Sequence, residues 1–417
     1  MKIKTKISLA TLGSTNFISV LANTILFPIF PTMRKALNLG LTEISLLVLL
    51  VSLPSAILNP LGGLLADSWG RKRIIVPSLF IYGLGGLIAG LAIVMIEDPY
   101  PVILAGRLLQ GIGSSTPMYL TTALAGDLFQ SKERNKAMGI LETSNGLGKL
   151  FSPLIGAFVG LIVWYAPFFV YPVVSFPVAI LIWILIKEPP RNQPFNWKNN
   201  TETLKLFKNT SKILSLTIAF ISIFLLIGTL FWMSDFLDAR LNAGKIARGF
   251  LLSLPIASLI LTTLLSGWLN NKFGPRIIMI AGTIMMSISF LFIPFTAHNV
   301  FLWPVVLLLG AGAGLIFPSL DTISSAITSK EHRGLFTTIF GGFRCLGAAI
   351  APSALSILLK KGLFISFIPL ALASLFFGVI SIFLVKEKDI LPEELQTEDK
   401  EDDNDEEEEK EEKEEGK

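Results

Sequence analysis

Long stretches of apolar residues, separated by short polar loops, follow one another from the N-terminus to about residue 385. Each stretch exceeds the roughly 20 residues that an α-helix needs to cross a bilayer core of about 30 Å. Backbone groups in a bilayer must be hydrogen-bonded within their own segment, and barrel strands are only about 9–11 residues long, so we expect helices. The pattern predicts twelve membrane spans, near residues 7–30, 44–66, 74–96, 101–124, 137–162, 164–187, 212–234, 249–270, 277–297, 300–326, 335–359 and 362–385.

Composition supports the same class of protein. Hydrophobic residues make up 52% and charged residues 16% of the 417 residues, which is more apolar surface than a soluble core of this size could bury. The first apolar stretch follows three lysines and is not followed by a convincing small-residue cleavage site, so we expect a membrane span there rather than a signal peptide. The chain is therefore predicted to be an all-α membrane protein.

Basic residues are concentrated at the N-terminus and in alternate loops, a bias that the positive-inside rule assigns to the cytoplasmic side. Both chain termini are therefore predicted to be cytoplasmic. At the opposite, outer end, Asp235 and Asp238 follow the seventh span, where they could be proton entry points or ordinary surface charges. The cytoplasmic bases are Lys2, Lys4, Lys6, Arg71, Lys72, Arg73, Lys132, Arg134, Lys136, Lys272, Arg276, Lys330 and Arg333.

The C-terminal segment differs from the rest of the chain. Residues 393–417 contain 16 acidic residues against 4 lysines, so they are too polar to fold by burial, and we expect a disordered tail. The tail could be merely solvated or could bind a partner. The rest of the chain carries a net charge of +16, which suits contact with anionic lipid headgroups rather than with nucleic acid.

Two glycine-containing loops occupy equivalent places in the two halves of the apolar pattern. The first contains Gly63, Asp67, Gly70 and Arg71, and a weaker copy, Ser266–Arg276, follows about 204 residues later. Gly62, seven further residues, Gly70 and a basic cluster, placed between two membrane-length helices, resemble the signature loop of the major facilitator superfamily. This resemblance implies a transporter with two pseudo-symmetric six-helix halves, which binds its substrate between them and rocks one half against the other.

Further matches between the halves support an internal repeat. The segment after the fourth span recurs after the tenth, and Gly148 and Pro153 recur as Gly347 and Pro352. The prolines at positions 189, 190 and 194 end the sixth span. We therefore divide the chain into an N-terminal half, a cytoplasmic linker, a C-terminal half and an acidic cytoplasmic tail, at residues 1–187, 188–211, 212–385 and 386–417.

The first glycine loop is a candidate gate. Asp67 lies at the cytoplasmic end of the second span, where the N-terminus of the eleventh span offers unpaired N–H groups to a carboxylate. In the superfamily, the residues that correspond to Asp67, Arg71 and Asp127 form a charge network, while Gly63 and Gly70 permit close approach and a tight turn. The alternative is a loop that only fixes topology. We call the predicted contact between Asp67 and the N-terminus of the eleventh span the latch. Because Asn271 replaces the aspartate in the second copy, we do not expect a corresponding charged contact there.

An arginine lies inside the fourth span. Arg107 is followed three residues later by Gln110 and a glycine, an arrangement that resembles a superfamily motif. By helix rise, Arg107 is roughly 9 Å inside the span, where a charge needs a partner or water. Arg107 and Gln110 are candidates for proton coupling or substrate contact. The alternative is that Arg107 only donates hydrogen bonds to backbone carbonyls.

The fifth span carries Gly148, Ser152, Pro153 and Gly156, which resemble the antiporter motif of exporters in the superfamily, with Ser152 in place of a glycine. Small residues and a proline favour a kinked helix that packs tightly against a neighbour. Export is therefore implied by the resemblance, whereas the residues alone would equally predict a simple packing interface.

A polar stripe occupies one face of the same span. Glu142 and Lys149 are seven residues apart with Asn145 between them, so the three side chains share a face that we expect to line the substrate cavity. Glu142 is the first candidate for a proton carrier and Asp321 the second, although either could be a hydrated helix-end charge. The charged residues within the predicted spans are Arg107, Glu142, Lys149, Asp321 and Arg344. Their charges sum to +1, so neutral and anionic amphiphiles remain possible substrates.

The resemblance implies a monomeric drug:proton antiporter of the cytoplasmic membrane, which exports hydrophobic or amphipathic small molecules. The chain shows no phosphate-binding loop, metal-ligand spacing or nucleophile–base set above chance, so we expect no enzyme activity, no metal and no cofactor besides a proton gradient. The expected partners are an amphipathic small molecule, protons and membrane lipids, and no nucleic acid.

Two other functions stay open. A substrate-specific facilitator for a sugar, a siderophore or a lipid headgroup would differ from a drug antiporter in failing to transport several unrelated compounds with protons. A non-transporting receptor or scaffold that uses the acidic tail would be disfavoured if transport survived deletion of residues 390–417.

Overall fold

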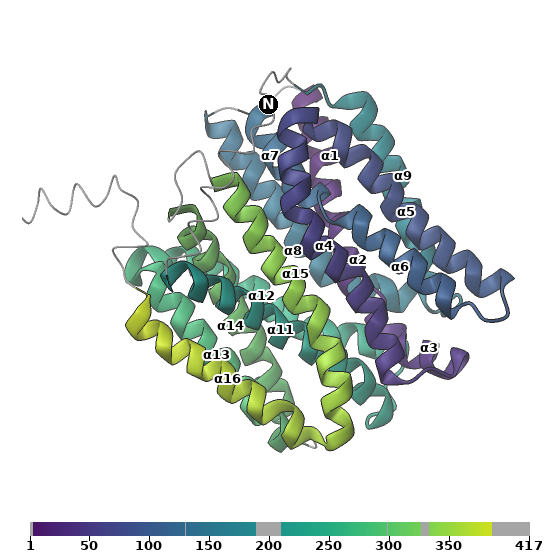
Figure 1. The fold of residues 1–417 in the computed structure, drawn as a ribbon, viewed down its shortest axis with the longest axis vertical. Helices are drawn as coiled ribbons and strands as arrows, with labels where there is room; N and C mark the ends of the chain where they lie inside the picture. Colours follow the sequence, from purple (N-terminus) through teal and green to yellow (C-terminus); the bar gives the residue numbers. More distant parts are fainter. Residues whose placement is uncertain (1–2, 130, 189–209, 298, 327–332, 386–417) are drawn as a thin grey trace, which may run out of the picture.

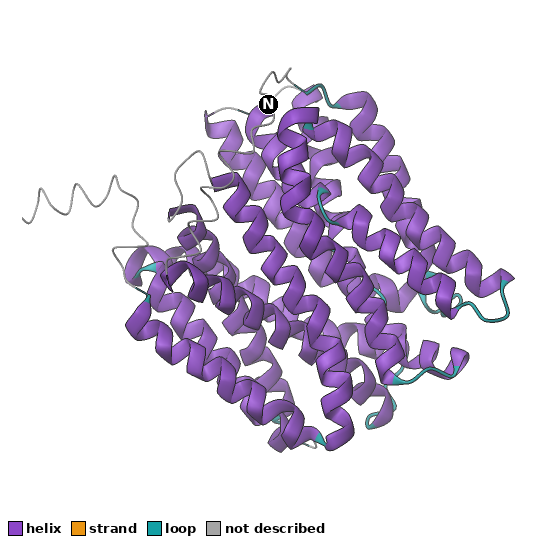
Figure 2. Ribbon diagram, in the orientation of Figure 1, coloured by secondary structure: helices purple, strands orange, loops and turns teal. Residues whose placement is uncertain are grey.

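The structure is a computed structural model that describes residues 3–129, 131–188, 210–297, 299–326 and 333–385. Every regular element in these ranges is helical (Figure 2), which confirms the predicted all-α class. The predicted linker and acidic tail fall almost entirely on residues 189–209 and 386–417, outside the described ranges. The domain boundaries at the linker and tail therefore stay predictions.

The N-terminal half forms six spans from ten helical segments. The first span is assembled from four short pieces, the fourth from α6 and α7, and the other spans are single helices. The segments are α1 (Ile3–Ser19), α2 (Leu21–Thr24), η1 (Phe27–Ile29), α3 (Phe30–Leu37), α4 (Leu41–Trp69), α5 (Arg71–Met95), α6 (Tyr100–Ser114), α7 (Pro117–Leu128), α8 (Ser131–Val159) and α9 (Pro167–Leu185).

The C-terminal half contributes the other six spans, and each of them is one helix. They are α11 (Thr210–Ala239), α12 (Lys245–Phe273), α13 (Pro275–Thr296), α14 (Leu302–Ala326), α15 (Arg333–Leu358) and α16 (Leu363–Leu384), with the short η3 (Leu359–Lys361) before α16.

By length and apolar composition, 10 helical segments of the described ranges could cross a membrane. Two of the twelve predicted spans are absent from this set for different physical reasons. The fourth span is interrupted just before Pro117, so α6 and α7 are each too short. The fifth span, α8, is 29 residues long but carries the polar stripe of Glu142, Asn145 and Lys149.

The first span is broken at its prolines. Pro28 and Pro31 have no N–H group, and the chain passes through the 3-10 turn η1 between α2 and α3. The carbonyl of Phe27, four residues before Pro31, loses its α-helical donor; it accepts the 3-10 bond from the Phe30 N–H and a hydrogen bond from Ser234 Oγ of α11 at 2.5 Å. Irregular backbone inside a membrane protein is tolerated only where protein or water satisfies its polar groups.

Two geometric features recur in both halves and confirm the pseudo-symmetric fold. Gly70 ends α4 with φ 95°, and Gly274 ends α12 with φ 81°, a left-handed conformation that strains other residues. Glycines also allow helix backbones to touch at equivalent crossings. A methyl group added there would lie 2.5–2.7 Å from a carbonyl oxygen of the facing helix, in the pairs Gly85 with Gly106 and Gly282 with Gly312.

The two halves lie side by side, the first coloured purple to blue and the second teal to yellow in Figure 1. They meet mainly where α4 packs against α15 and α8 against α12. A methyl group added to Gly342 of α15 would lie 2.8 Å from the Ala56 carbonyl of α4. One added to Gly249 of α12 would lie 2.6 Å from Ala157 of α8. These two helix pairs bring charged residues of both halves together.

Candidate functional site

Four of the predicted site residues gather around Tyr119 of α7, between the halves. Coulombic interactions connect Tyr119 with Glu142, Asp321 and Arg344, and connect Lys149 with the same three charges. The Arg344 guanidinium donates to Asp321 Oδ1 at 3.0 Å and lies over two phenylalanine rings, each 4.9 Å away. We call Tyr119, Glu142, Lys149, Asp321 and Arg344 the interface cluster.

The two candidate proton carriers differ in their surroundings. Asp321 is engaged by Arg344, although its side chain remains 60% exposed. Glu142 is exposed and makes no hydrogen bond or ion pair with any residue that the structure describes. A carboxylate without an ion pair can bind and release a proton without first breaking one, so Glu142 remains the first candidate.

Asn145 lies between Glu142 and Lys149 on α8 and is almost completely buried, with 5% of its surface exposed. Its Nδ2 donates to Met118 Sδ of α7 at 3.0 Å. Its Oδ1 has no hydrogen-bond partner among the described residues. This side chain therefore presents an unused acceptor beside the interface cluster.

Arg107 and Gln110 do not belong to this cluster. Arg107 is 1% exposed and donates four hydrogen bonds within the N-terminal half, at 2.7–3.2 Å. The acceptors are the carbonyls of Ala22 and Leu47, Gln110 Oε1 and Tyr171 Oη. This geometry favours the alternative role for Arg107, in which it joins α2, α4, α6 and α9 and does not contact substrate.

The antiporter-like motif packs α8 against the broken first span. Gly148, Ser152 and Gly156 lie one turn apart on a single face of α8, and Ser152 Oγ donates to the Leu21 carbonyl at 3.1 Å. A methyl group on Gly156 would lie 1.7 Å from the Ile25 carbonyl oxygen. The neighbouring Pro153 carbonyl instead faces Gly249 of α12. The motif therefore places α8 between the first span and the C-terminal half.

The first glycine loop contains the expected charge pair and a further acid. Arg71 Nη1 and Asp127 Oδ2 are 2.7 Å apart. Glu188, just after α9, accepts hydrogen bonds from the backbone N–H groups of Arg71 and Lys72 at 2.6 and 3.0 Å, which satisfies the free N-terminus of α5. The side chain of Asp67 and the first turn of α15 lie outside the described side chains, so the latch between them stays a prediction.

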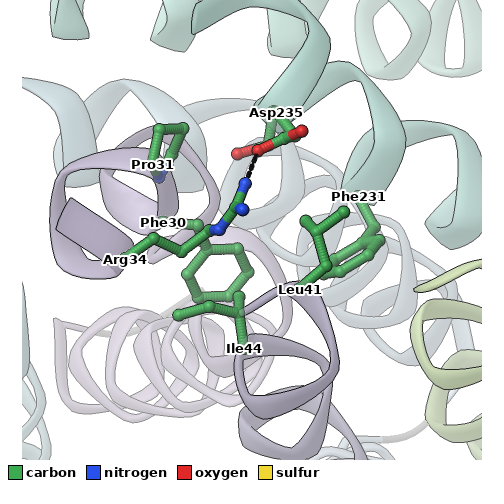
Figure 3. A pocket seen from close by; sticks show the side chains of 8 residues that line it. Phe30, Pro31, Arg34, Leu41, Ile44, Phe231 and Asp235 are labelled. Carbon is green, nitrogen blue, oxygen red and sulfur yellow. Dashed lines mark hydrogen bonds and ion pairs between the residues drawn. The ribbon is translucent and has the colours of Figure 1, made fainter. Parts of the chain in front are cut away.

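Ion pairs join the halves at the end predicted to face outside. Arg34 of α3 pairs with Asp235 of α11, as Figure 3 shows. Asp238 pairs with both Lys35, at 2.7 Å, and Arg248 of α12, at 2.9 Å. We call Arg34, Lys35, Asp235, Asp238 and Arg248 the outer ion-pair cluster. The sequence left Asp235 and Asp238 as surface charges or proton entry points, and the structure shows them bridging the halves.

Burial decides which of these pairs matters most. The Lys35 side chain is 73% exposed, so its pair is weak, whereas Arg248 is 4% exposed and its pair with Asp238 is shielded from water. A small pocket beside the Arg34–Asp235 pair is lined by apolar side chains of both halves, including Phe30, Leu41, Ile44 and Phe231 (Figure 3). This outer end is therefore held by apolar packing as well as by charge.

Two similar six-helix halves with charged residues between them define a membrane transporter. The family model of the Major Facilitator Superfamily matches residues 12–245 and 213–412, and the chain belongs to this family. Its membership confirms the resemblance noted in the glycine loop, and agrees with the expectation that the protein is not an enzyme.

The chain is similar to named transporters over most of its length. It is 30% identical over 386 residues to the bacillibactin exporter of Bacillus subtilis (strain 168), covering 91% of this chain and 95% of that protein. It is 26% identical over 351 residues to multidrug resistance protein 1 of the same organism, covering 81% and 87%. A solved bacterial homologue of the human lysosomal transporter Spinster shares the fold, with a TM-score of 0.74 at 15% identity, covering 94% and 100%.

We expect Gly156→Ala to destabilise the protein by roughly 1–3 kcal/mol, because the added methyl group overlaps the Ile25 carbonyl and α8 must shift. Gly139→Ala, on the same helix with no atom within 4 Å of the added methyl, is the matched control and should be neutral or slightly stabilising. Unfolding of the purified variants in detergent checks this. Equal stability of the two variants would contradict the tight α8 contact.

We expect Asp238→Asn to loosen the outer end, because Asp238 pairs with Lys35 of the other half and with the buried Arg248, which itself donates to Thr32 of the other half. The readout is labelling of Ser234→Cys by a membrane-impermeant maleimide, in a Cys345→Ser background. Labelling should rise severalfold over the same protein with Asp238 intact. Asp98→Asn, which alters an exposed acid in another loop of this end, should have no effect. Unchanged labelling in Asp238→Asn would show that the ion pairs of Asp238 do not hold this end closed.

Proposed function

We propose that the protein is a proton-driven exporter of hydrophobic or amphipathic small molecules. One observation carries the proposal: the helix with the antiporter-like motif, α8, also carries Glu142 and Lys149 of the interface cluster and contacts both the first span and α12. Movement of one half against the other must therefore alter the surroundings of the candidate proton carrier. One relative is named as a bacillibactin exporter and another as a multidrug resistance protein, and export of drugs would produce such resistance.

In this proposal the two ends of the interface open in turn. The outer ion-pair cluster and its apolar layer close one end, while Arg71, Asp127 and Glu188 order the glycine loop at the other. Glu142 would take up a proton when open to one side and release it to the other. The energy source would be the proton gradient across the cell membrane, with both termini in the cytoplasm, lipids around the bundle and a monomer as the working unit.

A dedicated exporter of one compound is the second candidate. It is favoured by the 30% identity to a protein named for export of a single compound, compared with 26% to the multidrug protein. A panel of chemically unrelated toxic compounds, tested in a host that lacks its own pumps, separates the two candidates. Resistance to several classes supports multidrug export, and resistance to none or one supports the dedicated exporter.

Glu142→Gln should abolish uphill export driven by a pH difference while leaving downhill exchange partly intact, because the amide keeps size and polarity but cannot carry a proton. Purified protein in liposomes, with a substrate selected by the resistance panel, provides the measurement. Glu97→Gln, an exposed acid outside the helices, serves as the matched control and should behave as the unaltered protein does. Continued accumulation by Glu142→Gln would exclude Glu142 as the essential carrier, and Asp321→Asn would be tested next.

A further inference from the structure

Lys149 is a charged group inside the predicted membrane region, and among the described residues it has no hydrogen-bond or ion-pair partner. It lies 10 residues before the end of α8 at Val159, which is about 15 Å along the helix axis. Its ammonium makes no hydrogen bond or ion pair with the residues that the structure describes. Its closest charged associates, Glu142, Arg344 and Asp321, act on it only through longer-range Coulombic interactions. An intramembrane cation in this state needs an anion or water.

The accessible part of Lys149 faces the interior of the bundle. The lipid side of α8 is marked by Leu147, Phe151 and Phe158, which are 41%, 44% and 49% exposed. At 3.6 residues per turn, Lys149 points roughly 180° away from these three residues. Because Lys149 is nevertheless only partly buried, the space that reaches it lies between the halves and not in the lipid.

The groups beside Lys149 have unused hydrogen-bonding capacity. Asn145 is one turn away on the same face of α8, and its buried Oδ1 lacks a donor among the described residues. The Tyr119 hydroxyl lies against the backbone of Gly341 and makes no hydrogen bond within the described part of the chain. In contrast, Arg344 is already paired with Asp321. The unused groups are therefore one cation, one amide oxygen and one hydroxyl.

We propose that Lys149 and Asn145 form a substrate site for an amphipathic molecule that carries an ionised acid and a hydrogen-bond donor. The acid binds the Lys149 ammonium, and a hydroxyl or amide N–H donates to Asn145 Oδ1. Residues one turn apart have Cβ atoms about 5–6 Å from each other, so one small molecule can reach both side chains. This inference rests on the proposed function, because it specifies what the exporter would carry.

The order of side chains along α8 gives the substrate a direction. Lys149 lies nearer the outer end, Asn145 follows, and Glu142 lies nearer the cytoplasmic end. The donor end of the substrate therefore points toward Glu142. A proton on Glu142 removes the negative charge that attracts the donor group of the substrate. Proton binding and substrate binding therefore weaken each other, as exchange of one for the other requires.

Binding of three matched probes to the purified full-length protein in detergent tests this site by calorimetry. The probes are 4-hydroxy-2-naphthoate, its uncharged primary amide and its 4-methoxy analogue, which keeps the acid but lacks the donor. The unaltered protein should bind the hydroxy acid at least about tenfold more tightly than the amide, since a charge-assisted contact contributes that much. It should bind the methoxy analogue more weakly than the hydroxy acid.

Variants on α8 assign these preferences to residues. Lys149→Gln should remove the preference for the acid and Lys149→Arg should retain it, while Asn145→Leu should remove only the preference for the hydroxyl. Lys136→Gln, an exposed lysine on the same helix, is the matched control and should bind as the unaltered protein does. An acid preference that survives Lys149→Gln, an equal loss in Lys136→Gln, or no binding of the hydroxy acid at all would overturn the site.

Two further measurements distinguish the substrate site from a lipid-headgroup site and from the proposed export function. If phosphatidylglycerol, and not the naphthoate, binds in a Lys149-dependent manner, the anion is a lipid headgroup and the substrate site is overturned. Proton-driven accumulation of the hydroxy acid in liposomes tests the proposed function separately. Lys149-dependent binding without accumulation would overturn proton-driven export while supporting the site, and accumulation unaffected by Lys149→Gln would overturn the site alone.

Discussion

The break in the first span supplies hydrogen-bond acceptors to helices that surround it. In a bilayer, irregular backbone is tolerated where the protein satisfies its polar groups, and polar side chains of three other helices donate to carbonyls of this segment. Each of these donors fixes one helix to the first span. The donors and their carbonyl acceptors are Ser152 of α8 with Leu21, Arg107 of α6 with Ala22, and Ser234 of α11 with Phe27. The positions of α6 and α8, and therefore of the polar stripe on α8, depend on this break.

These contacts divide the first span into two parts with different partners. The bonds of Arg107 and Ser152 lie within the N-terminal half and need not change when the halves move. The bond from Ser234 crosses to the other half, next to the Arg34–Asp235 pair. Opening of this end must exchange the donor at the Phe27 carbonyl, with water as the available replacement. A helix broken by prolines is suited to such an exchange, because Pro31 cannot give the Phe27 carbonyl its α-helical donor and only the 3-10 bond from the Phe30 N–H remains.

The sequence allowed correct predictions of features that depend on short stretches of the chain, such as the membrane spans and the glycine loops. The span number follows from apolar length and the glycine loops from motif spacing, while the family resemblance of the first loop implied the Arg71–Asp127 pair. Contacts between distant segments were harder to predict. One acceptor of Arg107, the Ala22 carbonyl, lies in the broken first span, and nothing near Arg107 in the chain signals that break. Glu188 could have been selected as an acid placed directly before the proline-rich end of the sixth span, at the same membrane surface as the glycine loop.

The outer ion pairs illustrate the same limit. Asp235 and Asp238 had two plausible roles, because their partners on α3 are about 200 residues away in sequence, as with Arg34 and Asp235. The interface cluster was foreseen more fully, since Glu142, Lys149, Asp321 and Arg344 are all charges in predicted spans. Tyr119 was not, because a tyrosine in an apolar stretch resembles ordinary core packing.

The glycine crossings within each half have a consequence for how such a protein can diversify. Gly85 with Gly106, and Gly282 with Gly312, bring backbones so close that not even a methyl group fits, so most substitutions there would disturb the whole half. Around Tyr119 and Lys149, by contrast, side chains of the two halves face one another with unused polar groups between them. Replacements at those positions can alter which molecules are recognised while leaving the framework of each half intact. The residues that maintain the helix packing are therefore different from the residues whose substitution can change substrate recognition.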